Sequence, residues 1–210
     1  MDSLGHDFEF ERRFFVAEMP EQFLTDVTPD LIVQTYFLAS QGYGLRIRLQ
    51  ATSLNKPVPE SIEGKEAVEL FADDFDLCIL AAKGPYTGGT RYEAERVLDV
   101  NVGTQMSLLG GSTITKLRYG VWLGQDGWVI DRFLGPNEPL IVAECERTSP
   151  VVNLEIPSFC VEEVTEDHRF SNDALTVEPF SKWSDLYHRS LQMNAPRFVT
   201  DFGVNIPLEP

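Results

Sequence analysis

The nine residues Phe8-Glu9-Phe10-Glu11-Arg12-Arg13-Phe14-Phe15-Val16 decide the fold of this chain. Read as a β-strand, the segment places Glu9, Glu11 and Arg13 on one face, because strand side chains alternate between two faces. Two carboxylates so spaced can hold a hard divalent cation, and the arginine can hold the phosphate that such a cation brings. For this strand alone, the wet face of an ordinary antiparallel sheet is the favoured interpretation. The recurrence of the pattern along the chain favours the first interpretation.

Length and composition indicate one globular domain over residues 1–210. The chain has 210 residues, of which 43% are hydrophobic, so it can bury a substantial core. No apolar run approaches the length of a bilayer span, and residues 1–7 lack a basic region followed by an apolar one. We therefore expect a soluble cytoplasmic protein that has no membrane partner.

The charge and the cysteines exclude several classes of protein. A formal net charge of -16 opposes nucleic-acid binding, since an acidic surface repels a phosphate backbone. A polyanionic substrate would therefore need a local basic cavity. Cys78, Cys145 and Cys160 are odd in number and form no CxxC pair, so we expect buried thiols rather than a disulfide framework or a zinc site.

Eight stretches have the composition or alternation of β-strands, and most are joined by short turns. They are residues 8–16, 31–39, 45–49, 77–83, 91–98, 114–123, 128–134 and 140–146. Residues 51–75 are interpreted as an insertion at a hairpin tip, with a short helix over 65–72. Further helices are predicted over 102–109, 158–168 and 181–193.

Ionisable side chains lie on one face of seven of these eight strands, all but 31–39. The basic members are Arg13, Arg46, Arg48, Lys83, Arg91, Lys116 and Arg118, and the acidic members are Glu9, Glu11, Glu93, Glu95, Asp131, Glu144 and Glu146. Such a set cannot form a dry core, because removing each ion from water costs several kcal/mol. Eight strands can close into a barrel whose interior accommodates side chains and one small ligand. Either the charged faces are exposed on an ordinary mainly β domain, or they line the wet interior of a closed eight-stranded antiparallel β-barrel.

The ordered set of motifs resembles the CYTH domain, or triphosphate tunnel metalloenzyme, family. The hallmark of that family is an N-terminal Glu-x-Glu-x-Lys strand, which corresponds here to residues 9–13. The resemblance covers about residues 8–180 and leaves 181–210 as a helical extension. Its other parts are residues 46–48, 83–85, 91–95, 116–119, 128–133, 143–146 and 162–172. The general form is most similar to the bacterial inorganic tripolyphosphatase branch.

This resemblance implies an eight-stranded antiparallel tunnel that binds a linear triphosphate with Mg²⁺ or Mn²⁺ and hydrolyses it. The implied phosphate-binding residues are Arg13, Arg46, Arg48, Lys83, Arg91, Lys116 and Arg118. The implied metal ligands are Glu9, Glu11, Glu144 and Glu146. Arg13, Glu93, Glu95 and Asp131 are the implied catalytic residues, and the three carboxylates among them would hold a second ion or orient the attacking water.

Arg13 departs from the family motif, which has lysine at this position. An arginine stays protonated, so it can clamp phosphate but cannot transfer a proton. The sequence therefore leaves open a non-catalytic polyphosphate-binding module. It also leaves open a nucleotide or thiamine triphosphate hydrolase or a class IV adenylyl cyclase, with ATP or thiamine triphosphate as substrate, and a homodimer.

The residues after the barrel receive ordinary interpretations. Trp183 and Tyr187, four residues apart, predict the apolar stripe of a helix that docks on the barrel. Glu162, Glu163 and Arg169 are interpreted either as a cap over one mouth of the tunnel or as a solvated helix face.

Overall fold

A computed structural model of the chain describes residues 8–85 and 90–208, with side chains in the first strand from Phe10 onward. The strands are β1 (Phe8–Val16), β2 (Asp30–Ser40), β3 (Tyr43–Ala51), β4 (Leu77–Lys83), β5 (Thr90–Val97), β6 (Ser112–Leu123), β7 (Asp126–Phe133), β8 (Ile141–Arg147), β9 (Glu155–Pro157), β10 (Cys160–Glu163) and β11 (Ile206–Leu208). The helices are α1 (Glu21–Asp26), α2 (Gly64–Leu70), α3 (Val100–Leu109), α4 (Asn172–Val177) and α5 (Ser184–Met193). Short 3-10 turns cover Gly135–Asn137, His168–Phe170 and Phe180–Lys182.

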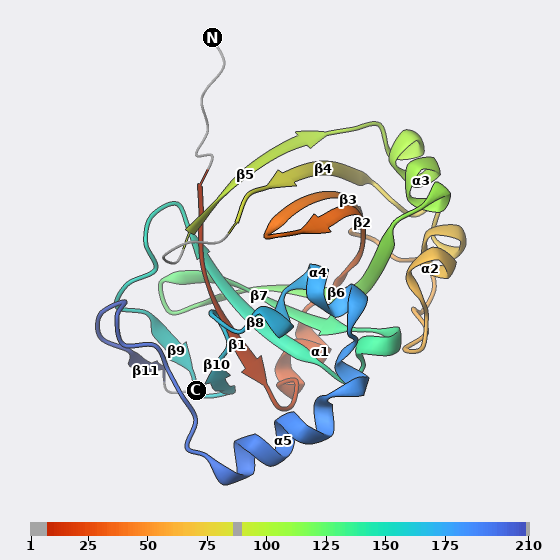
Figure 1. Ribbon diagram of the computed structural model, residues 1–210. Coiled ribbons are helices and arrows are strands. Elements are labelled where there is room, and N and C mark those ends of the chain that lie inside the picture. Colours follow the sequence, from red (N-terminus) through yellow and green to blue (C-terminus); the bar gives the residue numbers. More distant parts are fainter. Residues whose placement is uncertain (1–7, 86–89, 209–210) are drawn as a thin grey trace.

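Strands β1 to β8 form a closed antiparallel barrel (Figure 1). Their order around the wall is β1-β5-β4-β3-β2-β6-β7-β8, and β8 pairs again with β1. Strand β1 pairs with β5 only over Phe8–Phe10. Farther along the same edge of β1, residues Phe14–Val16 pair with β10. The predicted eight-stranded barrel is thus confirmed.

The strand register directs the charged faces into the barrel. Directly opposed residues of an antiparallel pair lie on the same face of a sheet. The opposed pairs include Glu11 with Glu146, Arg13 with Glu144, Arg118 with Asp131, Lys83 with Glu93, and Ile32 with Lys116. The shared faces therefore join into one continuous inner surface, here called the tunnel.

The insertion 51–75 packs against the outside of the barrel. Its residues Ile62, Val68 and Phe71 are buried in one apolar cluster with Ile47 and Leu49 of β3. Helix α3 covers the same side in Figure 1.

Gly103 shows how closely α3 approaches β4. A Cβ atom at Gly103 would lie 2.1 Å from Sγ of Cys78, so only glycine fits at this contact. All three cysteines are free and buried, as predicted.

An apolar cluster fills one end of the barrel. The inner face becomes apolar where β1, β2, β6, β7 and β8 reach that end, and the chain after the barrel packs onto it. The cluster contains Phe15, Tyr36, Ile114, Phe133 and Val142 from the strands, and Val164, Phe170, Leu175, Phe180, Trp183 and Tyr187 from the later residues. The predicted stripe of Trp183 and Tyr187 is confirmed, and α5 lies within the predicted helix.

The helix predicted over 158–168 is wrong. This segment instead contains β10, which pairs with the end of β1 beyond the last residue that β5 contacts. Since the backbone groups of a buried strand need partners, the unpaired edge of β1 favours a strand here. No helix within residues 8–85 and 90–208 is long and apolar enough to cross a bilayer.

The interpretation of Glu162 and Glu163 as a solvated helix face is wrong, because both residues are buried in β10. The carboxylate of Glu163 forms an ion pair with Arg12 on the outer face of β1. Glu162 lies opposite Phe15, and its carboxylate accepts a hydrogen bond from the hydroxyl of Tyr187, a residue of the cluster that fills one end of the barrel. Glu162 therefore lies at that end of the barrel, whereas Glu163 lies outside it.

Candidate active site

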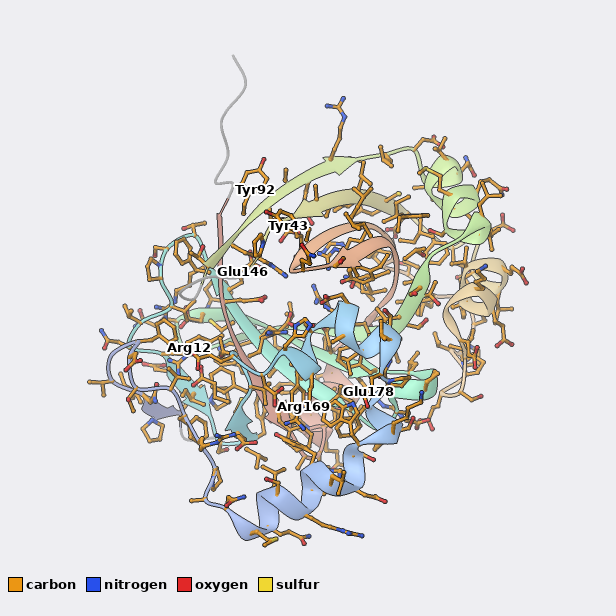
Figure 2. All side chains as sticks on the ribbon, in the orientation of Figure 1. Arg12, Tyr43, Tyr92, Glu146, Arg169 and Glu178 are labelled. Atoms are coloured by element: carbon orange, nitrogen blue, oxygen red, sulfur yellow. The ribbon has the colours of Figure 1, made fainter. Side chains whose placement is uncertain are left out.

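All the predicted cations lie on the inner face, and they come from five strands. The buried ones are Arg13, Arg46, Lys83 and Lys116, and the partly exposed ones are Arg48, Arg91 and Arg118. Figure 2 shows Glu146 where β8 meets β1, on the same inner face. The structure thus brings into one tunnel the cations and carboxylates that the sequence placed on separate strands.

Asp131 is the centre of a buried ionic cluster. Its carboxylate accepts hydrogen bonds from Nζ of Lys116 at 2.5 Å and from Nε and Nη2 of Arg118 at 2.7 Å each. Burial alone would raise the pKa of Asp131, but the charges of Arg118 and Lys116 outweigh it and lower the pKa to about 2. Burial lowers the pKa of Lys116 to about 8, against the opposing effect of Asp131. Asp131 is therefore ionised at neutral pH and holds two cations in place.

The low pKa of Asp131 predicts how stability depends on pH. A carboxyl whose pKa is lowered by folding stabilises the fold above its ordinary pKa of 3.8, and this contribution is lost as pH falls through about 2. We expect Asp131→Asn to lower the free energy of unfolding at neutral pH by on the order of 2 kcal/mol. Urea denaturation at a series of pH values should show the difference from the unmodified protein shrinking below about pH 4. A difference that is independent of pH would contradict this account.

Glu93 and Glu95 of β5 pair with the cations of β3 and β4. The carboxylate of Glu93 lies 2.5 Å from Nζ of Lys83 and 3.3 Å from Nη2 of Arg46. The carboxylate of Glu95 is more distant, at 3.6 Å from Nη2 of Arg48 and 3.9 Å from Nη2 of Arg46. Glu93 is thus held more closely than Glu95.

The carboxylates on β1 and β8 could hold a divalent cation. The register places Glu11 opposite Glu146, and Glu144 follows on the same face of β8; the side chain of Glu9 lies outside the described residues. Burial raises the pKa of Glu144, and the negative charges of Asp131 and Glu11 add to this effect. Carboxylate oxygens are the ligands that Mg²⁺ and Mn²⁺ prefer, so the donor type fits these ions. Among the described side chains, no three of Asp, Glu, His or Cys already converge as a metal site.

Arg13 links the tunnel to the chain that follows the barrel. Its Nη1 donates to the carbonyl oxygen of Phe170 at 3.3 Å, and its Nη2 donates to that of Thr165 at 3.1 Å. Its Nε lies 3.7 Å from the carboxylate of Glu11. The arginine that replaces the motif lysine therefore has a fixed orientation beside a candidate metal ligand.

Sequence reasoning missed three polar residues of the tunnel. Nη1 of Arg46 donates to the hydroxyl of Tyr36 at 3.4 Å, and this hydroxyl donates to Gln34 at 3.3 Å. The alternation of β2 could have placed Gln34 and Tyr36 on the inner face. Asn172 accepts a hydrogen bond from Nζ of Lys116 at 3.2 Å, and no local pattern predicted this contact.

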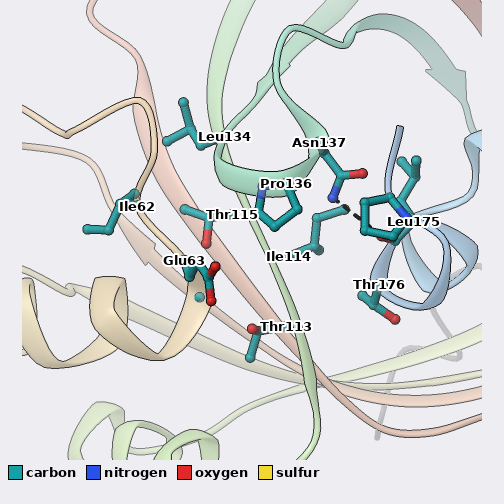
Figure 3. Close-up of a pocket in the computed structure, with 12 residues that line it drawn as sticks. Ile62, Glu63, Thr113, Ile114, Thr115, Leu134, Pro136, Asn137, Leu175 and Thr176 are labelled. Atoms are coloured by element: carbon teal, nitrogen blue, oxygen red, sulfur yellow. Dashed lines mark hydrogen bonds between the residues drawn. The ribbon is translucent and has the colours of Figure 1, made fainter. Parts of the chain in front are cut away.

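A small pocket lies between α2, β6 and the residues after the barrel (Figure 3). Its volume is about 50 Å³, which is room for a few water molecules. Thr115 and Pro136 line it, and the side chain of Asn137 donates to the carbonyl oxygen of Leu175 at its edge. This pocket is too small for a triphosphate, so the tunnel is the candidate active site.

The fold and the opposed charges on its inner face define a triphosphate tunnel protein. Over 112 residues the chain is 32% identical to the inorganic triphosphatase of Acetivibrio thermocellus, a match that covers 52% of this chain and 72% of that protein. The chain therefore belongs to the CYTH, or triphosphate tunnel metalloenzyme, family and to its bacterial inorganic triphosphatase branch.

Solved structures agree with this assignment. Two structures of NE1496, described as a hypothetical protein and as an inorganic triphosphatase, have TM-scores of 0.51 and 0.52 and sequence identities of 26% and 25%. Each covers 81% of this chain, and the matches cover 99% and 96% of those chains. No protein-family model matches the chain.

Proposed function

We propose that this protein hydrolyses a linear triphosphate, inorganic tripolyphosphate, in the barrel tunnel with the aid of Mg²⁺ or Mn²⁺. The observation that carries the proposal is the convergence of cations from five strands on the inside of a protein whose net charge is -16. Such a cavity attracts a polyanion that the acidic outer surface repels. The similarity to inorganic triphosphatases supports the same substrate class.

Each group of tunnel residues has a proposed role. The cations neutralise and orient the phosphate chain, which is much of what phosphoryl transfer requires of a protein. Glu9, Glu11, Glu144 and Glu146 are the proposed metal ligands. The bound ion supplies positive charge at the phosphate oxygens.

The other carboxylates are proposed to differ in role. Glu95, whose side chain is 38% exposed and only loosely paired, is the candidate to orient the attacking water. Asp131 acts as a positioning residue, because it is closely paired with two cations. Glu93 pairs with Arg46 and Lys83 before the substrate binds.

Arg13 supports a second candidate, a module that binds triphosphate without hydrolysing it. The guanidinium carries a fixed charge and is held by two backbone carbonyl groups, so it can bind phosphate but cannot transfer a proton. This candidate predicts a thermal shift with tripolyphosphate and no release of phosphate.

Phosphate release from purified protein tests both candidates. We expect release from tripolyphosphate with Mg²⁺ or Mn²⁺ and none in EDTA, with slower release from ATP and thiamine triphosphate. Arg48→Ala should raise KM by roughly tenfold, because it removes a charge-assisted contact to phosphate. Binding without release favours the module, and the absence of both a thermal shift and release contradicts both candidates.

A further inference from the structure

Glu93 pairs with two buried cations of the tunnel. Its side chain is 12% exposed, while those of Arg46 and Lys83 are 7% and 6% exposed. The three residues come from adjacent strands, β5, β4 and β3, and the shorter contact is the 2.5 Å one to Nζ of Lys83. Charges so far from water need a partner of opposite sign, and Glu93 is the carboxylate that approaches both cations most closely.

A carboxylate and a phosphate group compete for the same donors. Both accept charge-assisted hydrogen bonds from guanidinium and ammonium groups, and both can lie between two such donors. Arg46 and Lys83 are among the cations proposed to bind the triphosphate. The carboxylate of Glu93 and a phosphate group of the substrate cannot both occupy the position between them.

We propose, on the basis of the proposed function, that Glu93 is a built-in occupant of one phosphate subsite. In the unliganded protein its carboxylate lies between Arg46 and Lys83, and a phosphate group of the substrate displaces it. This displacement has an energetic cost, so it lowers the affinity for triphosphate.

Glu95 provides a matched control for this proposal. It lies two residues from Glu93 on the same face of β5, so neutralising either residue removes one negative charge from the tunnel. Glu95, however, approaches its cations no closer than 3.6 Å, and its side chain is 38% exposed. If only the net charge of the tunnel mattered, both substitutions would raise the affinity for triphosphate equally. If Glu93 must be displaced from a subsite, Glu93→Gln would raise the affinity more than Glu95→Gln.

The test is calorimetric titration of tripolyphosphate in EDTA at low salt into the unmodified protein, Glu93→Gln and Glu95→Gln. We expect Glu93→Gln to lower Kd by roughly tenfold or more, because a competing charge at about 3 Å is removed. Glu95→Gln should lower it by a smaller factor. Glu93→Asp, which keeps the charge on a shorter side chain, should give an intermediate Kd.

Thermal denaturation separates this inference from a simple loss of folding. Without ligand, Glu93→Gln should melt at a lower temperature than the unmodified protein, and tripolyphosphate should raise its Tm by more. Equal or weaker binding by Glu93→Gln, an equal gain in Glu95→Gln, or no binding by any of the proteins would overturn the inference. Phosphate release from the unmodified protein with Mg²⁺ tests the proposed function alone.

Discussion

Glu11→Gln is expected to slow phosphate release from tripolyphosphate by at least about a hundredfold. The substitution keeps the shape of the side chain but removes the negative charge that faces β8, where Glu144 and Glu146 lie across from β1. A divalent ion would then lose an anionic oxygen ligand, so the concentration of Mg²⁺ needed for half-maximal rate should also rise. Steady-state rates over a range of Mg²⁺ concentrations measure both effects.

Glu18→Gln is the control for Glu11→Gln. Glu18 is exposed in the segment after β1, so its neutralisation changes the net charge by the same amount outside the tunnel. Its rate should stay close to that of the unmodified protein. Retention of the full rate by Glu11→Gln, at the same Mg²⁺ concentration, would remove Glu11 from the proposed metal site.

Arg12→Ala is expected to lower the free energy of unfolding by about 3–5 kcal/mol. The side chains of Arg12 and Glu163 are 1% and 0% exposed, and Nη2 of Arg12 lies 2.6 Å from the carboxylate. Removing the arginine leaves a buried carboxylate without its charged partner, although the amide of Val199 and the hydroxyl of Thr165 still donate to it. Urea denaturation measures this loss of unfolding free energy. The slope of the unfolding free energy against urea concentration should be the same for Arg12→Ala and the unmodified protein.

A double substitution tests the cause of that loss. Arg12→Met combined with Glu163→Leu removes both charges and keeps most of the apolar volume, so no ion remains buried without a partner. We expect it to be more stable than Arg12→Ala, because an apolar replacement of a buried ion pair costs less than breaking the pair. If the double variant were less stable than Arg12→Ala, the unpaired charge of Glu163 could not explain the loss of stability in Arg12→Ala.

The sequence predicted the barrel and its inner face because both depend on local alternation. Once the strands pair in register, a residue such as Lys116 or Glu144 can only point to one side, so the shared charges converge. The same reasoning placed Arg12 and Arg13 on opposite faces, but it did not show what Arg12 would contact.

Contacts made after the barrel could not be predicted in this way. The partner of Arg12 is Glu163, which is 151 residues away and is brought to it by β10, a strand of only four residues. Asn172 begins α4, and a helix of six residues has too short a pattern to be read from sequence. The contacts of Glu163 and Asn172 depend on the path of the chain after β8, and the alternation of side chains in the strands does not specify that path.

The pairing of the first strand with the eighth has a consequence for synthesis on the ribosome. Strand β1 leaves the ribosome before the other strands of the barrel, but its partner β8 ends at Arg147, so Glu144 can reach Glu11 only after all the intervening strands have been synthesised. Pairings between such distant segments form late, because the intervening loop must first be closed. A nascent chain that ends before β8 would therefore contain every cation of the tunnel and still lack Glu144 and Glu146, two of the four carboxylates proposed to hold its metal.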